Sequence, residues 1–219
     1  MRIGVLGTGV VGHAIGTKLA QLGHEVKMGS RQSGNEKAVT WARAAGEHAS
    51  EGSFEDAAAF GEVIVNCTAG VHSLAALGAA GAANLTGKLL VDLANPLDYS
   101  SGMPPTLAVC NTSSLGEQIQ SSFSDAKVVK ALNTVTWEVM VEPARAPGDH
   151  VVFVCGEDAD AKSQVSELLE SFGWPPDRIL DLGGIRAARG AEMYLPLLLT
   201  LSGELGTSHF NIAVLGASG

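Results

Sequence analysis

A glycine-rich turn directly follows the first apolar stretch of the chain and constrains its fold more than any other feature. The stretch RIGVLG has the β-branched character of a buried strand, and apolar residues at helical spacing follow from Val10 to Leu22. Between them Gly7, Gly9 and Gly12 form the pattern GxGxxG. In this context the pattern predicts a dinucleotide-binding turn, in which the three glycines permit the tight turn, the approach of a diphosphate and close helix packing. The alternative is a strand–helix turn that binds nothing.

Strand-like and helix-like stretches alternate along the first 135 residues. Further strands are predicted for HEVKMG, EVIVNCTAG, KLLVDLANP and AKVVKALNT, with a short one near residues 48–49. Helices are predicted for NEKAVTWARAAG, SFEDAAAF, residues 73–83 and SLGEQIQSSF. This alternation indicates a parallel sheet covered on both faces. The predicted fold class is therefore α/β, a doubly wound Rossmann-type parallel sheet.

The pattern changes in residues 136–219. A strand (DHVVFVCG), an amphipathic helix (DADAKSQVSELLESFG) and a short strand (RILDLG) precede a long apolar helix from about Ala187 to Gly203. The final HFNIAVL alternates like a strand, which could pair within the subunit or across a dimer. We expect a dinucleotide-binding domain over 1–135 and a small α+β extension over 136–219, packed as one compact unit.

Composition excludes several classes of partner. The net charge of −9 disfavours nucleic acid and anionic membranes. Cys67, Cys110 and Cys155 form no CxxC, and the six histidines are scattered, so we expect reduced thiols and no metal site. The chain shows no leader pattern, and its longest apolar stretch, MYLPLLLTL, is too short to span a bilayer. These features predict a cytoplasmic protein without membrane contact.

The end of the second strand indicates which dinucleotide is bound. An acid that binds the adenosine ribose is expected there, about 20 residues after the glycines, but the chain has Ser30 and Arg31. A guanidinium can bind a 2′-phosphate that a carboxylate would repel, so the sequence favours NADP(H). Lys37 is either a second cation for this phosphate or a solvated helix residue, and Arg31 itself could be an ordinary surface arginine.

Loops after the other strands are expected to border the nicotinamide, because ligands cross the carboxyl ends of a doubly wound sheet. Small residues, including Thr68 and Ala69, follow one strand, and Asn95 follows the next. Ala131 and Asn133 follow the last strand of the first part. None of these positions supplies an evident nucleophile, base or metal ligand. We predict no catalytic side chain, since hydride transfer requires only two correctly positioned rings.

Three stretches together resemble one family along nearly the whole chain: GTGVVGHAIGTKLAQLGHEVKMGSR, VVKALNTV and LDLGGIRAARGAEMYLPLLLTL. They are similar to the F420-dependent NADP oxidoreductases (8-hydroxy-5-deazaflavin reductases) and to the related cytosolic domain of six-transmembrane metalloreductases. The resemblance implies that NADP(H) is bound by Thr8, Val10, Val11, Ser30 and Arg31. It places the nicotinamide ring near Ala69, Ala131 and Asn133.

The resemblance also implies an activity and an assembly. It implies hydride transfer between NADP(H) and coenzyme F420 or a flavin in a shallow cleft bordered by the extension, with either direction of transfer open. It implies a homodimer, which the long apolar helix could serve. The loops NCTAGVHS and LDYSSGMPPTLAVC differ from those of the archaeal deazaflavin enzymes, and this leaves the acceptor open.

Two rival functions remain. An imine or keto reductase of the β-hydroxyacid dehydrogenase type needs a large helical C-terminal domain and often a lysine or an acid that acts on the substrate carbonyl. Here the last lysine is Lys162, and Lys130 lies within a predicted strand as a structural or cofactor-side group. The other rival is a redox sensor that binds NADP(H) without turnover.

Overall fold

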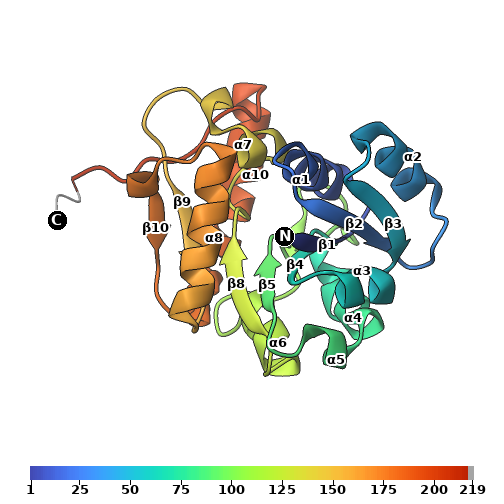
Figure 1. Ribbon diagram of the computed structural model, residues 1–219. Helices are drawn as coiled ribbons and strands as arrows, with labels where there is room; N and C mark the ends of the chain where they lie inside the picture. The colour runs from blue at the N-terminus through green and yellow to red at the C-terminus, as the bar shows by residue number, and fades with distance from the viewer. Residues whose placement is uncertain (217–219) are drawn as a thin grey trace.

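An eight-stranded sheet runs through the protein in the order β10-β9-β8-β5-β4-β1-β2-β3 (Figure 1). We describe it from a computed structural model, in which residues 1–216 are described. All neighbouring strands pair in parallel except β8 and β9. The strand bounds are Arg2–Leu6 (β1), Glu25–Ser30 (β2), Ala49–Ser53 (β3), Val63–Asn66 (β4), Leu89–Asp92 (β5), Lys127–Ala131 (β8), Val152–Cys155 (β9) and Ile179–Asp181 (β10). The predicted α/β, doubly wound class is confirmed.

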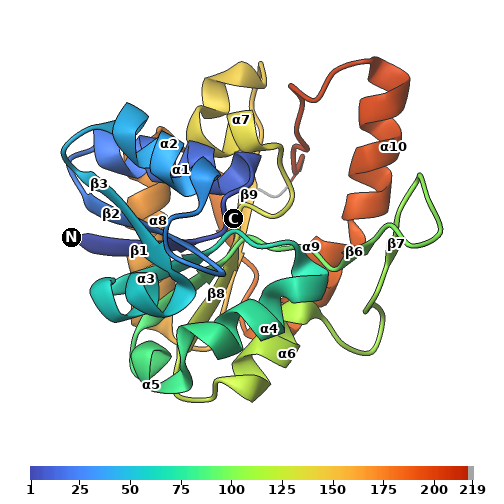
Figure 2. The ribbon, with the colours of Figure 1, turned by 90° about the vertical axis from the view of Figure 1, so that its right-hand side faces the viewer.

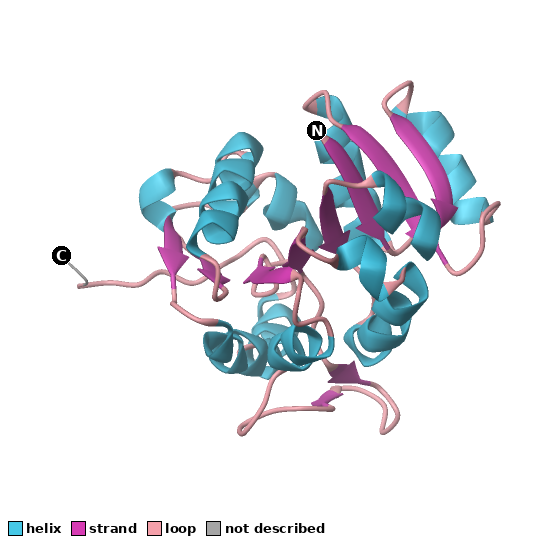
Figure 3. Ribbon diagram, turned by 60° about the horizontal axis from the view of Figure 1, so that its bottom comes forward, coloured by secondary structure: helices cyan, strands magenta, loops and turns pink. Residues whose placement is uncertain are grey.

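Helices cover both faces of this sheet (Figure 3). One face packs against α1 (Val10–Gln21), α2 (Glu36–Ala45), α7 (Trp137–Val141) and α8 (Ala159–Phe172). The other packs against α3 (Phe54–Phe60), α4 (Gly70–Ala80), α5 (Ala82–Leu85) and α6 (Leu115–Ser122), with α9 (Ala188–Met193) beside α6. Burial of apolar side chains on both faces explains why the central strands β1, β4 and β5 are apolar runs and not alternating patterns.

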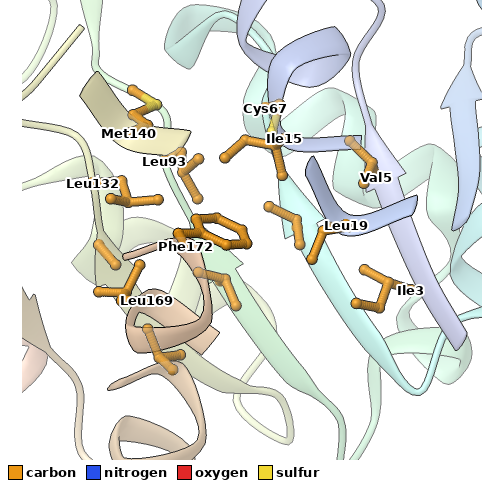
Figure 4. Packing of buried hydrophobic residues seen from close by; sticks show 14 of the residues in the cluster. Ile3, Val5, Ile15, Leu19, Cys67, Leu93, Leu132, Met140, Leu169 and Phe172 are labelled. Atoms are coloured by element: carbon orange, nitrogen blue, oxygen red, sulfur yellow. The ribbon is translucent and has the colours of Figure 1, made fainter. Parts of the chain in front are cut away.

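The two hydrophobic cores follow from the pleat of the strands, because successive side chains point to opposite faces. Ile3 and Val5 of β1 belong to the first core, together with Leu19 and Phe172 from the covering helices (Figure 4). Leu6, one residue further along β1, belongs to the second core. The sheet is thus buried from both sides, and its ligand-accessible parts are the loops at the strand ends.

The carboxyl ends of four strands meet along one edge of the sheet. Leu6 pairs with Asn66, Asn66 pairs with Asp92, and Asp92 pairs with Lys130 in the register of β1, β4, β5 and β8. The loops that follow these strands therefore lie side by side. The sequence predicts that the dinucleotide binds at this edge.

The last part of the chain departs from two predictions. The single long helix is wrong: α9 ends at Met193, and α10 (Leu195–Leu205) begins after Tyr194. Pro196 stands in the first turn of α10, where its missing N–H costs no helical hydrogen bond. Figure 2 shows α10 projecting from the sheet layer, on the side where the hairpin of β6 (Leu97–Asp98) and β7 (Thr106–Leu107) lies.

The predicted final strand is also wrong, because residues 209–215 contain no strand. Val151 donates its N–H to Ile212 O at 3.0 Å, but the carbonyl of Val151 accepts the side-chain amide of Asn211 at 2.7 Å. A side chain thus takes the place that a second strand would need for pairing. There are also smaller differences. Helix α4 spans Gly70–Ala80, whereas the prediction was residues 73–83. The short α7 and the β6–β7 hairpin were not predicted.

The extension shares the sheet with the first part of the chain. Its strand β9 pairs with β8, and β10 pairs with β9. The boundary at residue 135 stays a prediction. Within residues 1–216 no helix is both long enough and apolar enough to cross a membrane.

Candidate functional site

A cleft of about 630 Å³ opens at the carboxyl ends of β1, β2 and β4. It brings together three segments that are far apart in the sequence. The predicted site residues that line it are Gly7, Thr8 and Gly9 of the β1–α1 turn, Ser30 and Arg31 at the end of β2, and Thr68 and Ala69 of the β4–α4 turn. His72 and Asn35 also line it.

The β1–α1 turn has the geometry that a diphosphate requires. Gly7 has a φ of +120°, and a Cβ on Gly12 would lie 2.1 Å from Gly7 O, so only glycine permits this close helix–strand contact. Helix α1 has Gly9 as its N-cap, no side-chain cap and no acid in its first turn. Nothing lies within 4 Å of where a Cβ on Gly9 would stand. Free N–H groups of a helix N-terminus therefore face open space, which suits an anion.

The end of β2 carries one exposed cation beside a second hollow. Ser30 is buried, and its hydroxyl donates to the carbonyl of Gln32, which shapes the turn. Arg31 is exposed and lines both the main cleft and a depression of about 300 Å³ formed with residues 32–35. Lys37 is exposed on α2 and lies outside the residues that line either hollow. The arrangement offers a guanidinium and polar turn groups to a second phosphate.

The β4–α4 turn forms a further wall of the cleft. Helix α4 begins with Ala69 as N-cap and, like α1, has no side-chain cap and no acid in its first turn. The other helices of eight or more residues in the sheet layers, α2, α6 and α8, are capped by Asn35, Ser114 and Asp158. Burial raises the pKa of the Cys67 thiol well above its usual range, so this cysteine is not a nucleophile.

Behind this wall lies a buried polar cluster that the sequence analysis did not identify as a unit. Asn66 donates its side-chain amide to Asp92 Oδ1 at 2.8 Å, and Lys130 Nζ lies 2.7 Å from Asp92 Oδ2. Glu192 of α9 lies 2.8 Å from the same Nζ. Lys130 also donates to the carbonyl of Ala94. Lys130, which the sequence left as a structural or cofactor-side group, is thus a structural cation with 1% exposure.

Glu192 links this cluster to the N-terminus of α6. Its carboxylate accepts the backbone N–H groups of Leu115 at 2.8 Å and Gly116 at 3.0 Å, which are otherwise unpaired at a helix start. Burial lowers the pKa of Lys130, but the carboxylates of Asp92 and Glu192 outweigh this and raise it above its ordinary value. Lys130 therefore stays charged.

The remaining predicted site residues lie outside the main cleft. Asn95 and Asn133 bind each other: Asn95 Nδ2 donates to Asn133 O, and Asn133 Nδ2 donates to Asn95 Oδ1, both at 2.9 Å. Ala131 is fully buried at the end of β8. Leu132, which lies between Ala131 and Asn133 in the chain, has a φ of 60°, a backbone conformation that is strained for a bulky side chain. Two strand-end loops are thus held together at the edge where the ring is predicted to lie.

The three other glycine-turn residues have different surroundings. Gly12 is buried, and Val11 packs against the first core. Val10 is 64% exposed and lines a groove of about 610 Å³ between α1 and α7, with His13 and Trp137. Among residues 1–216 no group of three histidine, cysteine, aspartate or glutamate side chains could hold a metal ion.

Comparisons with known proteins find relatives of this chain along nearly its whole length. A family model described as NADP oxidoreductase, coenzyme F420-dependent, matches residues 2–96. The chain is 30% identical over 213 residues to the F420-dependent NADP reductase of Methanothermobacter marburgensis, with 92% of each chain covered. It is 32% identical over 212 residues to the metalloreductase STEAP3 of Rattus norvegicus; the match covers 94% of this chain, which spans only 38% of that relative.

A solved structure matches almost the whole chain. The crystal structure of an Arthrobacter sp. FB24 protein, assigned as an F420-dependent NADP reductase, superimposes with a TM-score of 0.91 at 51% sequence identity. The match covers 97% of this chain and 98% of the other.

Proposed function

The chain belongs to the family of F420-dependent NADP oxidoreductases, and from this premise we propose that it transfers a hydride between NADP(H) and a deazaflavin or flavin acceptor. The observation that carries the proposal is the cleft that an uncapped helix N-terminus and the guanidinium of Arg31 line together. When bound, the nicotinamide supplies or accepts the hydride.

The residues of the cleft suit the dinucleotide. Gly7, Thr8 and Gly9, with the first N–H groups of α1, would hold the diphosphate. Arg31 would bind the 2′-phosphate, and Asn35 and the turn before it border the same depression. This assignment favours NADP(H) over NAD(H), because an exposed guanidinium pairs with the additional phosphate.

The residues nearest the predicted ring position are suited to orient it and not to exchange protons. Asn95 and Asn133 use their side-chain amides on each other, and Ala131 has no exposed side chain. Cys67 is held protonated by burial. What these residues contribute is a fixed surface against which two rings can be aligned, which is the requirement of hydride transfer.

The extension would add the acceptor side of the site. Trp137, the first residue of α7, is 40% exposed and lines the groove that begins at Val10, next to the phosphate turn. An exposed aromatic ring beside the dinucleotide turn suits a planar acceptor. This supports a division of the chain into a dinucleotide-binding domain over residues 1–135 and an extension over residues 136–219 that borders the acceptor.

We further propose a homodimer that uses α10. Leu195 and Leu198 of this helix are buried, but Leu197 and Leu205 are 54% and 58% exposed. Such an apolar surface on a projecting helix suits a second copy of the chain. Light scattering of the protein, compared with a Leu197→Glu, Leu205→Glu variant, tests this; a wild-type monomer at micromolar concentration contradicts it.

Turnover with defined acceptors tests the activity. The purified protein is mixed with NADPH and, in separate reactions, oxidised F420, FMN, and a panel of ketones and cyclic imines, and the loss of NADPH absorbance is followed. Fast oxidation with F420 or FMN and none with the panel is the expected result. Oxidation only with imines or ketones would move the protein to the imine reductase type. Tight NADPH binding without turnover on any acceptor would indicate the sensor.

A further inference from the structure

A closed ring of hydrogen bonds lies directly behind the cleft wall formed by the β4–α4 turn. Asn66 Nδ2 donates to Ser73 Oγ at 3.1 Å, and Thr68 Oγ1 donates to Asn66 Oδ1 at 2.7 Å. Ser73 Oγ and Thr68 Oγ1 lie 2.9 Å apart, which closes the ring. Asn66 and Ser73 are fully buried, whereas Thr68 is partly exposed and lines the cleft.

Two neighbours fix the orientation of the Asn66 amide. Its oxygen also accepts the backbone N–H of Thr68 at 3.2 Å, and its nitrogen faces Asp92 Oδ1 at 2.8 Å. A flipped amide would point its N–H₂ group at the N–H of Thr68 and its oxygen at a carboxylate. Both contacts would then be repulsive, so only the observed orientation satisfies the buried groups.

Asp92 cannot exchange its acceptor role for a donor role. Lys130 Nζ lies 2.7 Å from Asp92 Oδ2, and the side chains of Asp92 and Lys130 are 0% and 1% exposed. Asp92 Oδ2 thus accepts from the ammonium of Lys130, and Oδ1 accepts from Asn66 Nδ2 and from the backbone N–H of Ala94. The ion pair therefore sets the direction of the hydrogen bond from Asn66, and through it the direction of the whole ring.

The ring determines where the hydroxyl proton of Thr68 goes. Asn66 Oδ1 can only accept, so at 2.7 Å the proton of Thr68 lies between the two oxygens. Ser73 already accepts from Asn66, and it must donate its own proton to Thr68 Oγ1. Thr68, which lines the cleft, has then donated its one proton and accepted one, and a single lone pair of its hydroxyl oxygen is left.

We propose that Thr68 is an acceptor-only recognition residue, whose polarity is set by the buried ring and whose partner is a hydrogen-bond donor of the bound dinucleotide. This inference rests on the proposed function, since it needs the dinucleotide in this cleft. Three groups of NADP(H) are donors: the carboxamide N–H₂, the adenine amino group and the ribose hydroxyls. A ligand group that can only accept would meet a lone pair and be disfavoured.

Binding of coenzyme analogues to Thr68 variants tests the proposal. Dissociation constants are measured by calorimetry for NADP⁺, for its 3-acetylpyridine analogue, which lacks the carboxamide N–H₂, and for its hypoxanthine analogue, which lacks the amino group. Thr68→Val should weaken NADP⁺ binding about fivefold, the effect of one neutral hydrogen bond. Thr68→Ser, which keeps the hydroxyl, should bind NADP⁺ as the wild type does. Thr68→Ala removes the hydroxyl without placing a methyl group against Asn66, and serves if the valine variant does not fold.

The analogues identify the donor. If Thr68→Val leaves the affinity for the acetylpyridine analogue unchanged, the partner is the carboxamide; if it leaves that for the hypoxanthine analogue unchanged, the partner is the amino group. Equal losses for all three ligands assign a ribose hydroxyl. Folded valine and alanine variants that bind NADP⁺ as tightly as the wild type overturn the proposal, and so does a loss that Thr68→Ser does not restore. A wild-type protein that binds no dinucleotide instead defeats the proposed function itself.

Discussion

The two turns that line the cleft at the ends of β1 and β4 are built in different ways. The β1–α1 turn is held by the backbone, with Gly7 at a positive φ and Gly12 packed against Gly7 O. The β4–α4 turn is held by side chains, through Asn66 and the ion pair of Asp92 with Lys130. The first is specified within six neighbouring residues, whereas the second depends on residues as distant as Glu192. A binding surface can thus combine a locally encoded half with a half encoded by long-range contacts.

Removing the cation of the second turn should produce the largest effect. Lys130→Met leaves the carboxylates of Asp92 and Glu192 buried without a counter-charge, which typically costs about 3–5 kcal/mol. Urea unfolding should therefore show a much lower midpoint. The matched control is Lys127→Met, because Lys127 and its partner Asp158 are both partly exposed, and such a surface pair contributes about 1 kcal/mol or less. Equal losses in the two variants would show that the buried cluster does not hold the turn.

A Cβ at position 12 should disrupt the β1–α1 turn for a steric reason. Gly12→Ala places a Cβ about 2.1 Å from Gly7 O, so the helix must move from the strand, at about 3 kcal/mol and with loss of NADPH affinity. Gly78→Ala is the control: nothing lies within 4 Å of its Cβ position in α4, and alanine should stabilise this exposed helix site by about 0.5–1 kcal/mol. Unfolding curves and NADPH titrations measure both. A Gly12→Ala protein that binds NADPH normally would refute the close-contact role.

The same contrast explains what the sequence could predict. The strand–glycine–helix order made the α/β fold and the β1–α1 turn predictable, because both depend on local pattern and on residues close in the chain. Polar residues near the ends of three buried strands, Asn66, Asp92 and Lys130, were a visible signal of the cluster, but their alignment depends on strand register. Register and the arrival of Glu192 from α9 are long-range facts, and no local pattern contained them.

The C-terminal errors have a related cause. The helix pattern around Tyr194 continues through Pro196 in sequence, yet the chain begins a new helix there. Residues 209–215 alternate as a strand does, but Asn211 takes the carbonyl of Val151 with its side chain. In both places one side chain or one missing N–H overrides a propensity that extends over several residues.

Removing the cation at the end of β2, which also lines the cleft, should weaken the binding of one nucleotide selectively. Arg31→Ala removes an exposed guanidinium that no buried cluster supports, so folding should not change. NADPH affinity should fall by about 1.5–3 kcal/mol, the contribution of a charge-assisted hydrogen bond, and NADH affinity should hardly change. Titrations of both nucleotides measure this. Equal losses for the two would place Arg31 away from the 2′-phosphate.

The smallest expected effect concerns the rim of the α6–α9 contact and is a change in how the stability of the protein depends on pH in acid. Glu117 of α6 accepts two hydrogen bonds from Arg189 of α9, at 2.6 and 2.8 Å. The hydrogen bonds from Arg189 lower the pKa of Glu117 below its ordinary 4.5. A depressed pKa in the folded state gives stability above the ordinary value, and this is lost as pH falls through the depressed one.

Glu117→Gln should therefore leave the pH dependence of unfolding unchanged near neutrality and flatten it below a pH of about 4.5. The buried Lys130 pair behaves in the opposite way, because the raised pKa of Lys130 gives stability that is lost only as pH rises through the alkaline range. Urea unfolding at a series of pH values separates the two. If Glu117→Gln destabilises the protein equally at neutral and acid pH, the pair acts by packing and not by charge.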